Sequence, residues 1–211
     1  MLKSLSEHLQ ERLKQPLPGA KAHDIMRATP VGPVTPDFRH KTPPRPGAVL
    51  IALYEDEGII KFPLIKRQEY LGAHSGQVSL PGGKAEGNED AVQTALREAK
   101  EEIGLGAEGL EVIGKLSDFF VIPSNFLVTP IVVVSNSIPQ LNPDPREVAR
   151  ILTGNLFELT TQNAIKNKEI IAAGNYRMLA PHFEIEGEVV WGATAMILNE
   201  LCHIVREVVE Q

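Results

Sequence analysis

Apolar and polar positions alternate along this chain in patterns that predict several elements. Four leucines at helical spacing among charges, Leu2, Leu5, Leu9 and Leu13, predict an amphipathic helix over residues 1–15. The continuous apolar run 48–54 predicts a buried strand, a turn follows at 55–58, and residues 59–67 read as the returning strand of a hairpin. Six prolines between Pro30 and Pro46 predict an extended surface segment with little regular structure.

A second helix is expected from about Asp90 to Ile103, with Asn88 as its N-cap and Gly104 as its stop. A final amphipathic helix is expected over 193–209. Further strands are predicted at 110–120, 127–134, 176–181 and 188–191, a short helix or turn at 144–152, and an edge segment at 156–159. Helices mixed with hairpin-connected strands predict an α/β sandwich around a mixed sheet, with no second globular domain.

Composition narrows the class of protein. The 211 residues are 43% hydrophobic and can bury a full core, while the formal charge of −6 argues against a general nucleic-acid binder. The single cysteine, Cys202, is expected to be a packed core thiol and excludes an internal disulfide. Because there is no apolar signal region and no run of about 20 apolar residues, a cytoplasmic protein without a membrane partner is expected.

Three carboxylates crowd one stretch of the predicted 90–103 helix. Glu98, Glu101 and Glu102 occupy positions i, i+3 and i+4, which lie within about a third of the helix circumference. Like charges at this spacing repel each other, and the repulsion grows where solvent is partly excluded. A hard divalent cation with oxygen ligands, Mg²⁺ or Mn²⁺, would relieve it. The stretch therefore predicts a metal site; an acidic helix face in water is the alternative interpretation.

The same stretch resembles the Nudix box, G-x5-E-x7-R-E-U-x-E-E-x-G-U, where U is a bulky aliphatic residue. All seven fixed letters are present, and Ala99 departs at one soft aliphatic position; the seven are Gly83, Glu89, Arg97, Glu98, Glu101, Glu102 and Gly104. The resemblance implies a Nudix-type α/β/α sandwich and metal-dependent hydrolysis of a nucleoside diphosphate derivative. It divides the chain into an N-terminal helix and proline-rich arm, 1–45, and a Nudix hydrolase domain, 46–211.

The segment 64–83 is similar to the signature of the coenzyme A pyrophosphatase branch, L-L-x-x-R-S-x-x-L-R-x-H-x-G-Q-x-x-F-P-G-G. Eight positions match: Arg67, Leu71, His74, Gly76, Gln77, Pro81, Gly82 and Gly83. Gln68, Gly72 and Leu80 depart, and the arginine absent at 72 would have suited a phosphate. This resemblance implies coenzyme A or acyl-coenzyme A as substrate; ADP-ribose, NADH or a modified nucleotide is the alternative.

The two resemblances imply roles for individual residues. Glu98, Glu101, Glu102 and the Gly83 carbonyl would hold Mg²⁺ or Mn²⁺. Glu101 or Glu102 would take a proton from water, and Arg97 would orient a glutamate. Substrate contacts would come from Arg67, His74, Gln77 and Gly82.

Several interpretations stay open. Glu89 is either an auxiliary ligand or a first-turn acid, His74 is a pocket or loop imidazole, and Trp191 is a core or groove residue. At most one of Lys66 and Arg67 should face the site, because they alternate along a strand. A non-catalytic nucleotide-sensing module is the rival from another class, although no box glutamate is lost. Homodimerisation is also considered, with the N-terminal helix packing on a partner or on its own core.

Overall fold

A mixed sheet forms the centre of the computed structural model, which describes residues 1–32, 38–69, 76–172 and 176–210. Its central strand β2 (Arg45–Asp56) pairs antiparallel with β3 (Ile59–Arg67) and parallel with β8 (Phe126–Ser135). The sheet order is β4-β3-β2-β8-β6, with β5 on β2, β7 on β8 and β9 on β3. These outer strands are β4 (Val78–Ser79), β5 (Gly82–Lys84), β6 (Leu110–Lys115), β7 (Phe119–Val121) and β9 (Val148–Asn155).

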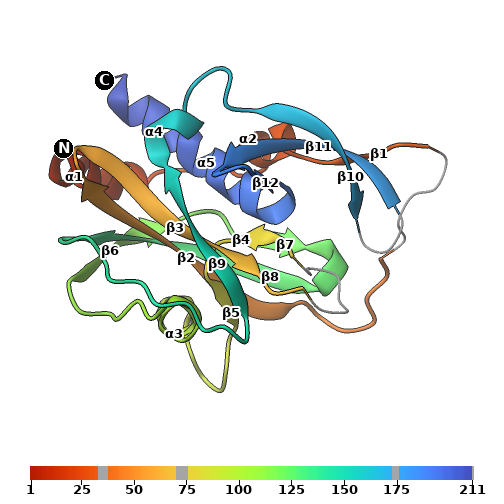
Figure 1. Ribbon diagram of the computed structural model, residues 1–211, viewed down its shortest axis with the longest axis horizontal. Coiled ribbons are helices and arrows are strands. Elements are labelled where there is room, and N and C mark those ends of the chain that lie inside the picture. The colour runs from red at the N-terminus through yellow and green to blue at the C-terminus, as the bar shows by residue number, and fades with distance from the viewer. Residues whose placement is uncertain (33–37, 70–75, 173–175, 211) are drawn as a thin grey trace.

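Helices cover both faces of this sheet (Figure 1). On one face lies α3 (Ala91–Ile103), which buries Ala95, Ala99 and Ile103 against it. The long α5 (Gly192–Val209) lies on the other face. It is accompanied there by α1 (Leu2–Arg12), α2 (Ala20–Ile25) and α4 (Leu156–Leu159). The predicted α/β sandwich around a mixed sheet is confirmed.

A smaller sheet lies beside α5. Its order is β1-β11-β10, with β12 paired to β11. The strands are β1 (Thr29–Pro30), β10 (Lys166–Ala172), β11 (Tyr176–Ile185) and β12 (Glu188–Val190). The sequence pattern had indicated parts of β11 and β12 but not β10, whose residues are mostly exposed and so lack an apolar alternation.

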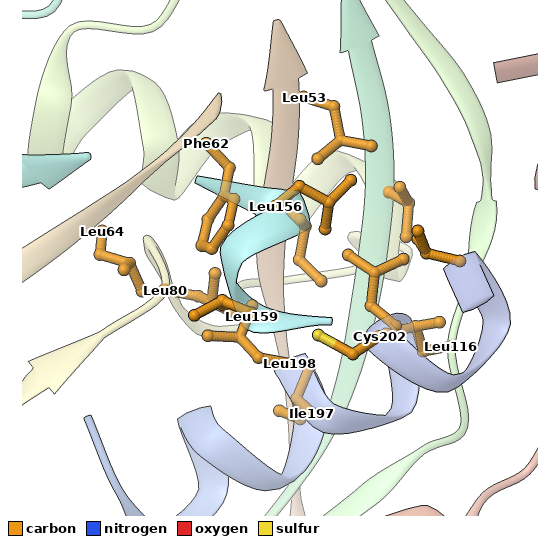
Figure 2. Packing of buried hydrophobic residues seen from close by; sticks show 14 of the residues in the cluster. Leu53, Phe62, Leu64, Leu80, Leu116, Leu156, Leu159, Ile197, Leu198 and Cys202 are labelled. Atoms are coloured by element: carbon orange, nitrogen blue, oxygen red, sulfur yellow. The ribbon is translucent and has the colours of Figure 1, made fainter. Parts of the chain in front are cut away.

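The larger core lies between the main sheet and α5. Figure 2 shows Leu53, Phe62, Leu156 and Leu198 in the same packed cluster as Cys202, all of them buried. Burial raises the pKa of the Cys202 thiol to about 12, so the thiol stays protonated and unreactive at neutral pH. The prediction of a core thiol is confirmed.

The N-terminal helix packs on its own chain. Leu2, Leu5 and Leu9 are buried in the core shared with α5, and Leu9 has no exposed surface. The apolar face of α1 is thus already covered, so it offers no free surface to a second copy. Within the described residues, no helix is long and apolar enough to cross a membrane.

Two local predictions were wrong, and the one for residues 144–152 was right only for its turn. The N-cap of α3 is Asp90, not Asn88, because Asp90 and Gln93 exchange hydrogen bonds in a capping box. Residues 144–147 form a turn in which Val148 N donates to the Asp144 carbonyl, and the chain then continues as β9 beside β3. Residues 156–159 are helical because the Asn155 side chain accepts from the first free backbone N–H groups.

Candidate active site

A cleft of about 930 Å³ opens where α3, the β4–β5 segment, α5 and the N-terminal arm meet. Several of the predicted site residues line it: Arg67, Gln77, Gly82, Gly83, Glu98 and Glu102. The arrangement follows from the fold, because residues 80–84 cross from the edge strand β4 to β5 alongside α3, with Gly82 bonded to Glu102 and Gly83 next to Glu98. His74 lies outside the described residues.

The carboxylate of Glu102 is the most buried group of the predicted metal set. It is 2% exposed, and its Oε2 accepts a hydrogen bond from Gly82 N at 2.8 Å. Burial raises the pKa of Glu102 to about 7, with Glu98 and Glu147 adding to the rise and Gly82 N–H and Arg67 opposing it. A positive charge that enters the cleft would lower the pKa of Glu102 and so ionise its carboxyl group.

Glu98 lies one turn earlier on α3 and faces the same cleft. Burial also raises the pKa of Glu98, and the neighbouring Arg97 opposes the rise. Its carboxylate lies directly against Gly83, since a Cβ at position 83 would be only 2.6 Å from the carboxylate carbon of Glu98. Glycine at 83 therefore allows the carboxylate and the β5 backbone to meet.

Glu101 differs from its two neighbours. Its side chain is 60% exposed, bonds to Arg97 Nη1 at 3.0 Å, and is not among the described residues that line the cleft. Across the described part of the chain, no three His, Cys, Asp or Glu side chains gather closely enough to enclose a metal ion. The structure therefore brings two of the three predicted carboxylate ligands together and leaves the third in solvent.

Arg97 acts as a clamp on the acidic side chains around it. Its Nε and Nη2 contact the two oxygens of Glu89 at 2.7 and 3.1 Å, and its Nη1 contacts Glu98 Oε1 at 3.0 Å. A further bond runs from Nη2 to the carbonyl of Lys84 on β5. The hydrogen bond from Arg97 lowers the pKa of Glu89 to about 2. Glu89 thus anchors Arg97, and Arg97 in turn fixes Glu98.

Arg67 and Ser79 add polar side chains to the lining of the cleft. They face the same side of neighbouring strands, since Ile65 lies opposite Ser79 and Arg67 N donates to the Gln77 carbonyl. Arg67 Nη1 lies 3.8 Å from Glu102 Oε1. Among the described residues, Arg67 Nε and Ser79 Oγ find no hydrogen-bond partner although both atoms are buried. Lys66 points elsewhere and pairs with Glu188 at 2.8 Å, as strand alternation requires.

One acidic residue of the cleft was missed from the sequence. Glu147, in the turn before β9, lines the cleft and raises the pKa of both Glu98 and Glu102 through its charge. Two backbone hydrogen bonds hold this turn, from Gln68 N to the Glu147 carbonyl and from Asp144 N to the Glu102 carbonyl. No local pattern marks Glu147, because only the pairing of β9 with β3 brings it to the site.

The donor set fits a hard divalent cation. Glu98 and Glu102 supply only oxygen atoms, which Mg²⁺ and Mn²⁺ prefer over nitrogen and sulfur, and Glu147 lines the same cleft. Burial, with smaller contributions from neighbouring carboxylates, raises the pKa of both Glu98 and Glu102, and a bound cation would favour their ionised forms.

Comparison with known proteins identifies the domain family that this chain matches. Residues 43–173 match the NUDIX domain. Nudix hydrolase 22, chloroplastic, of Arabidopsis thaliana is 37% identical over 77% of this chain and 56% of its own length, and Nudix hydrolase 15, mitochondrial, of the same plant is 34% identical over 78% and 60%. The uncharacterized Nudix hydrolase NudL of Yersinia pestis is 36% identical over 65% of this chain and 69% of its own.

The chain thus spans less than two thirds of the two plant relatives. Among solved structures, a MutT/nudix family protein from Enterococcus faecalis superposes with a TM-score of 0.50 at 15% identity, over 83% of this chain and 66% of that one, which indicates a shared fold. The match of the domain over most of the chain, together with the box residues gathered at the cleft, shows that this chain belongs to the Nudix hydrolase family.

Proposed function

We propose that this protein hydrolyses the pyrophosphate bond of coenzyme A or acyl-coenzyme A with Mg²⁺ or Mn²⁺, giving 3′,5′-ADP and (acyl-)4′-phosphopantetheine. The observation that carries the proposal is the cleft itself, in which Glu98 and Glu102 face Arg67 and Ser79. Family membership supports hydrolysis of a nucleoside diphosphate derivative, and the similarity of residues 64–83 to the coenzyme A signature supports the narrower substrate.

In this proposal, different side chains of the protein bind the cation and the substrate. Glu98 and Glu102 hold the cation, with Gly83 beside them, and Arg97 keeps Glu98 in place. When bound, the cation neutralises phosphoryl oxygens and makes a coordinated water more acidic. Arg67, whose side chain lines the cleft and is 27% exposed, donates to phosphate oxygens. Gln77 and Gly82 form the adjoining wall, and His74 is proposed to contact the substrate on sequence grounds alone.

A carboxylate must also take the proton of the attacking water. Of the two residues considered, Glu101 and Glu102, the second has the better position, because it lines the cleft while Glu101 is bonded to Arg97 in solvent. Glu147 is a further candidate on the same wall.

The alternative substrate is another nucleoside diphosphate derivative such as ADP-ribose, NADH or a modified nucleotide. Glycine at position 72, where the coenzyme A signature carries arginine, favours this alternative. A non-catalytic sensing module is less well supported, because Glu98 and Glu102 are both present and directed at the cleft. The cytoplasmic location and a homodimer also remain proposals.

The test is product analysis by liquid chromatography and mass spectrometry. Wild type, Glu102→Gln and Glu101→Gln are incubated with coenzyme A or ADP-ribose in Mg²⁺ or Mn²⁺. We expect 3′,5′-ADP and phosphopantetheine from wild type, at least about 100-fold less from Glu102→Gln, and a smaller loss from Glu101→Gln. If ADP-ribose is turned over as fast as coenzyme A, the proposal that coenzyme A is the specific substrate is rejected. If all three proteins are equally active, the proposed role of Glu102 is rejected.

A further inference from the structure

Part of the cleft lining comes from outside the matched domain. Helix α2 and the residues after it precede the range 43–173, and they contribute Ala20, His23, Arg27 and Ala28. Among the described lining residues, His23 is the only imidazole, and it is 5% exposed. The chemistry of the box glutamates uses none of these four residues, so His23 is a buried titratable group to which the reaction gives no role.

A buried carboxylate fixes the ring of His23. Glu200 on α5 has no exposed surface and accepts a hydrogen bond from His23 Nε2 at 2.9 Å. It also accepts from Gly19 N at 2.9 Å, from Ser117 Oγ at 2.6 Å and from Ser117 N at 3.2 Å. Burial raises the pKa of Glu200, but the hydrogen bonds outweigh it, so the pKa lies below its usual value and the group is ionised at neutral pH.

Two further contacts hold this part of the lining in place. The buried Asn199 on α5 donates from Nδ2 to the Ala22 carbonyl of α2 at 2.7 Å. The ring of His23 meets the ring of Phe119 edge-on, with 5.1 Å between the ring centroids. The protein itself therefore sets the position and the orientation of the imidazole before any ligand binds.

The bond to Glu200 decides which ring nitrogen of His23 carries the proton. An ionised carboxylate can only accept, so Nε2 is protonated, and in a neutral ring Nδ1 is then an acceptor. Nδ1 makes no hydrogen bond to another described residue, and it is not among the described side-chain atoms that are buried without a partner. It therefore reaches the cleft, where it suits a ligand group that donates a hydrogen bond.

A nucleotide offers two kinds of neutral donor, the ribose hydroxyls and an exocyclic amino group of the base. The hydroxyls are shared by all nucleoside diphosphate derivatives, whereas the amino group depends on the base. A phosphate oxygen without a proton cannot donate and would face the lone pair of Nδ1. In coenzyme A the 3′-oxygen of the ribose carries a phosphate, so the 2′-hydroxyl is the remaining ribose donor.

We propose that His23 binds the substrate by accepting a hydrogen bond from the ribose 2′-hydroxyl through Nδ1. Glu200 is the positioning residue that holds the ring and its tautomer. The inference rests on the proposed function, because the choice of the 2′-hydroxyl follows from coenzyme A. It gives α2, which lies outside the matched domain, a direct contact with the substrate.

The first test measures the binding of nucleotides that have no pyrophosphate to cleave. AMP, 2′-deoxyAMP, 3′-deoxyAMP and IMP are titrated calorimetrically with Mg²⁺ at pH 8, where an imidazole is ordinarily neutral. The variant His23→Gln keeps an amide N–H that can bond to Glu200 and removes the Nδ1 acceptor. His8→Gln, on the exposed side of α1, is the matched control.

We expect wild type to bind 2′-deoxyAMP about 10-fold more weakly than AMP, because Nδ1 then loses its donor. The affinities for 3′-deoxyAMP and IMP should stay close to that for AMP. His23→Gln should bind AMP and 2′-deoxyAMP equally, and His8→Gln should behave as wild type. Equal affinity of wild type for AMP and 2′-deoxyAMP would overturn the proposal whether or not His23→Gln folds, and so would a loss confined to 3′-deoxyAMP or to IMP.

The role of Glu200 has a separate readout in the ring tautomer. Proton–nitrogen NMR of the histidine rings reports which nitrogen is protonated, and the signal absent from His23→Gln identifies His23. We expect the Nε2–H form in wild type. In Glu200→Gln the new amide can donate to Nε2, so the proton should move to Nδ1 and the preference for AMP over 2′-deoxyAMP should disappear. A wild-type ring protonated on Nδ1 alone would overturn the assignment.

Hydrolysis of coenzyme A is assayed separately, so the two proposals can fail independently. A protein that distinguishes AMP from 2′-deoxyAMP without cleaving coenzyme A keeps the contact of His23 and loses the proposed function. A protein that cleaves coenzyme A without making this distinction keeps the proposed function and loses the contact.

Discussion

Replacing Glu102 by glutamine should make the metal-free protein more stable while it removes activity. The pKa of this carboxyl rises from its usual 4.5 to about 7 in the folded state, chiefly because the group is buried. Since each pH unit between the two pKa values corresponds to about 1.4 kcal/mol, ionised Glu102 destabilises the fold by roughly 3 kcal/mol above neutral pH. Glutamine is uncharged and can still accept the Gly82 N–H bond.

The pH dependence follows from the direction of the shift. Between pH 4.5 and about 7 the folded state binds more protons at Glu102 than the unfolded state does. The contribution of Glu102 to the free energy of unfolding is therefore complete below pH 4.5, falls as the pH rises, and is lost above about 7. The glutamine variant has no such dependence at this position, so the two proteins should be similar at pH 4.5 and differ most at pH 8.

The assay is urea denaturation of wild type and Glu102→Gln at both pH values, with EDTA and again with Mg²⁺. At pH 8 in EDTA the variant should be more stable by about 2–3 kcal/mol, and Mg²⁺ should stabilise only the wild type appreciably. Glu101→Gln is the control, because its exposed side chain should shift stability by less than about 0.5 kcal/mol. A glutamine variant that is less stable than wild type at pH 8 without metal would refute the reasoning.

Three further substitutions test other contacts. Gly82→Ala should destabilise the protein by about 2 kcal/mol or more in urea melts, because Gly82 has a φ of 150° and a Cβ there would lie 2.3 Å from the Ala48 carbonyl oxygen; an unchanged midpoint would contradict this. Glu200→Ala should lower the free energy of unfolding by about 3–5 kcal/mol, since four donors, one buried and three partly buried, lose their acceptor; a loss under about 1 kcal/mol would show that water replaces the carboxylate. Arg97→Lys should reduce kcat or metal affinity by about 10- to 100-fold, because a lysine cannot bridge three acidic side chains. As a control in the same assay, Lys100→Ala on the same helix should leave kcat and metal affinity unchanged.

Most of the main sheet, and the helix α3 that carries the box glutamates, could be predicted from the sequence. Strands such as β2 and β8 are runs of apolar residues, and α3 has an apolar stripe with a glycine at its end. Where local signals competed, the prediction failed. A short helix or turn was predicted over 144–152; the turn is present, but pairing with β3 extends the residues from Val148 onward as β9.

The site was only partly predictable for a related reason. Spacing on α3 places Glu98 and Glu102 on one face, which the sequence alone indicates. It cannot show that Glu101 remains exposed on Arg97, or that Glu147 joins the cleft, because both depend on contacts between distant segments. The apolar lining of the cleft was equally hidden, since the residues of that lining are scattered from Ala20 to Ile197.

The parallel pairing of β2 with β8 has a consequence for how the protein folds. The paired residues, from Arg45 with Phe126 onward, are about 80 positions apart along the chain, and the whole box lies in the loop between them. The entropy of closing that loop must be met before the central ladder can form. Helix α3 can begin locally through its capping box, but the burial of Glu102 beneath Gly82 has to wait for β5 to join β2. Ribosome-bound chains that have not yet emerged as far as β8 should therefore carry the acidic helix without the cleft.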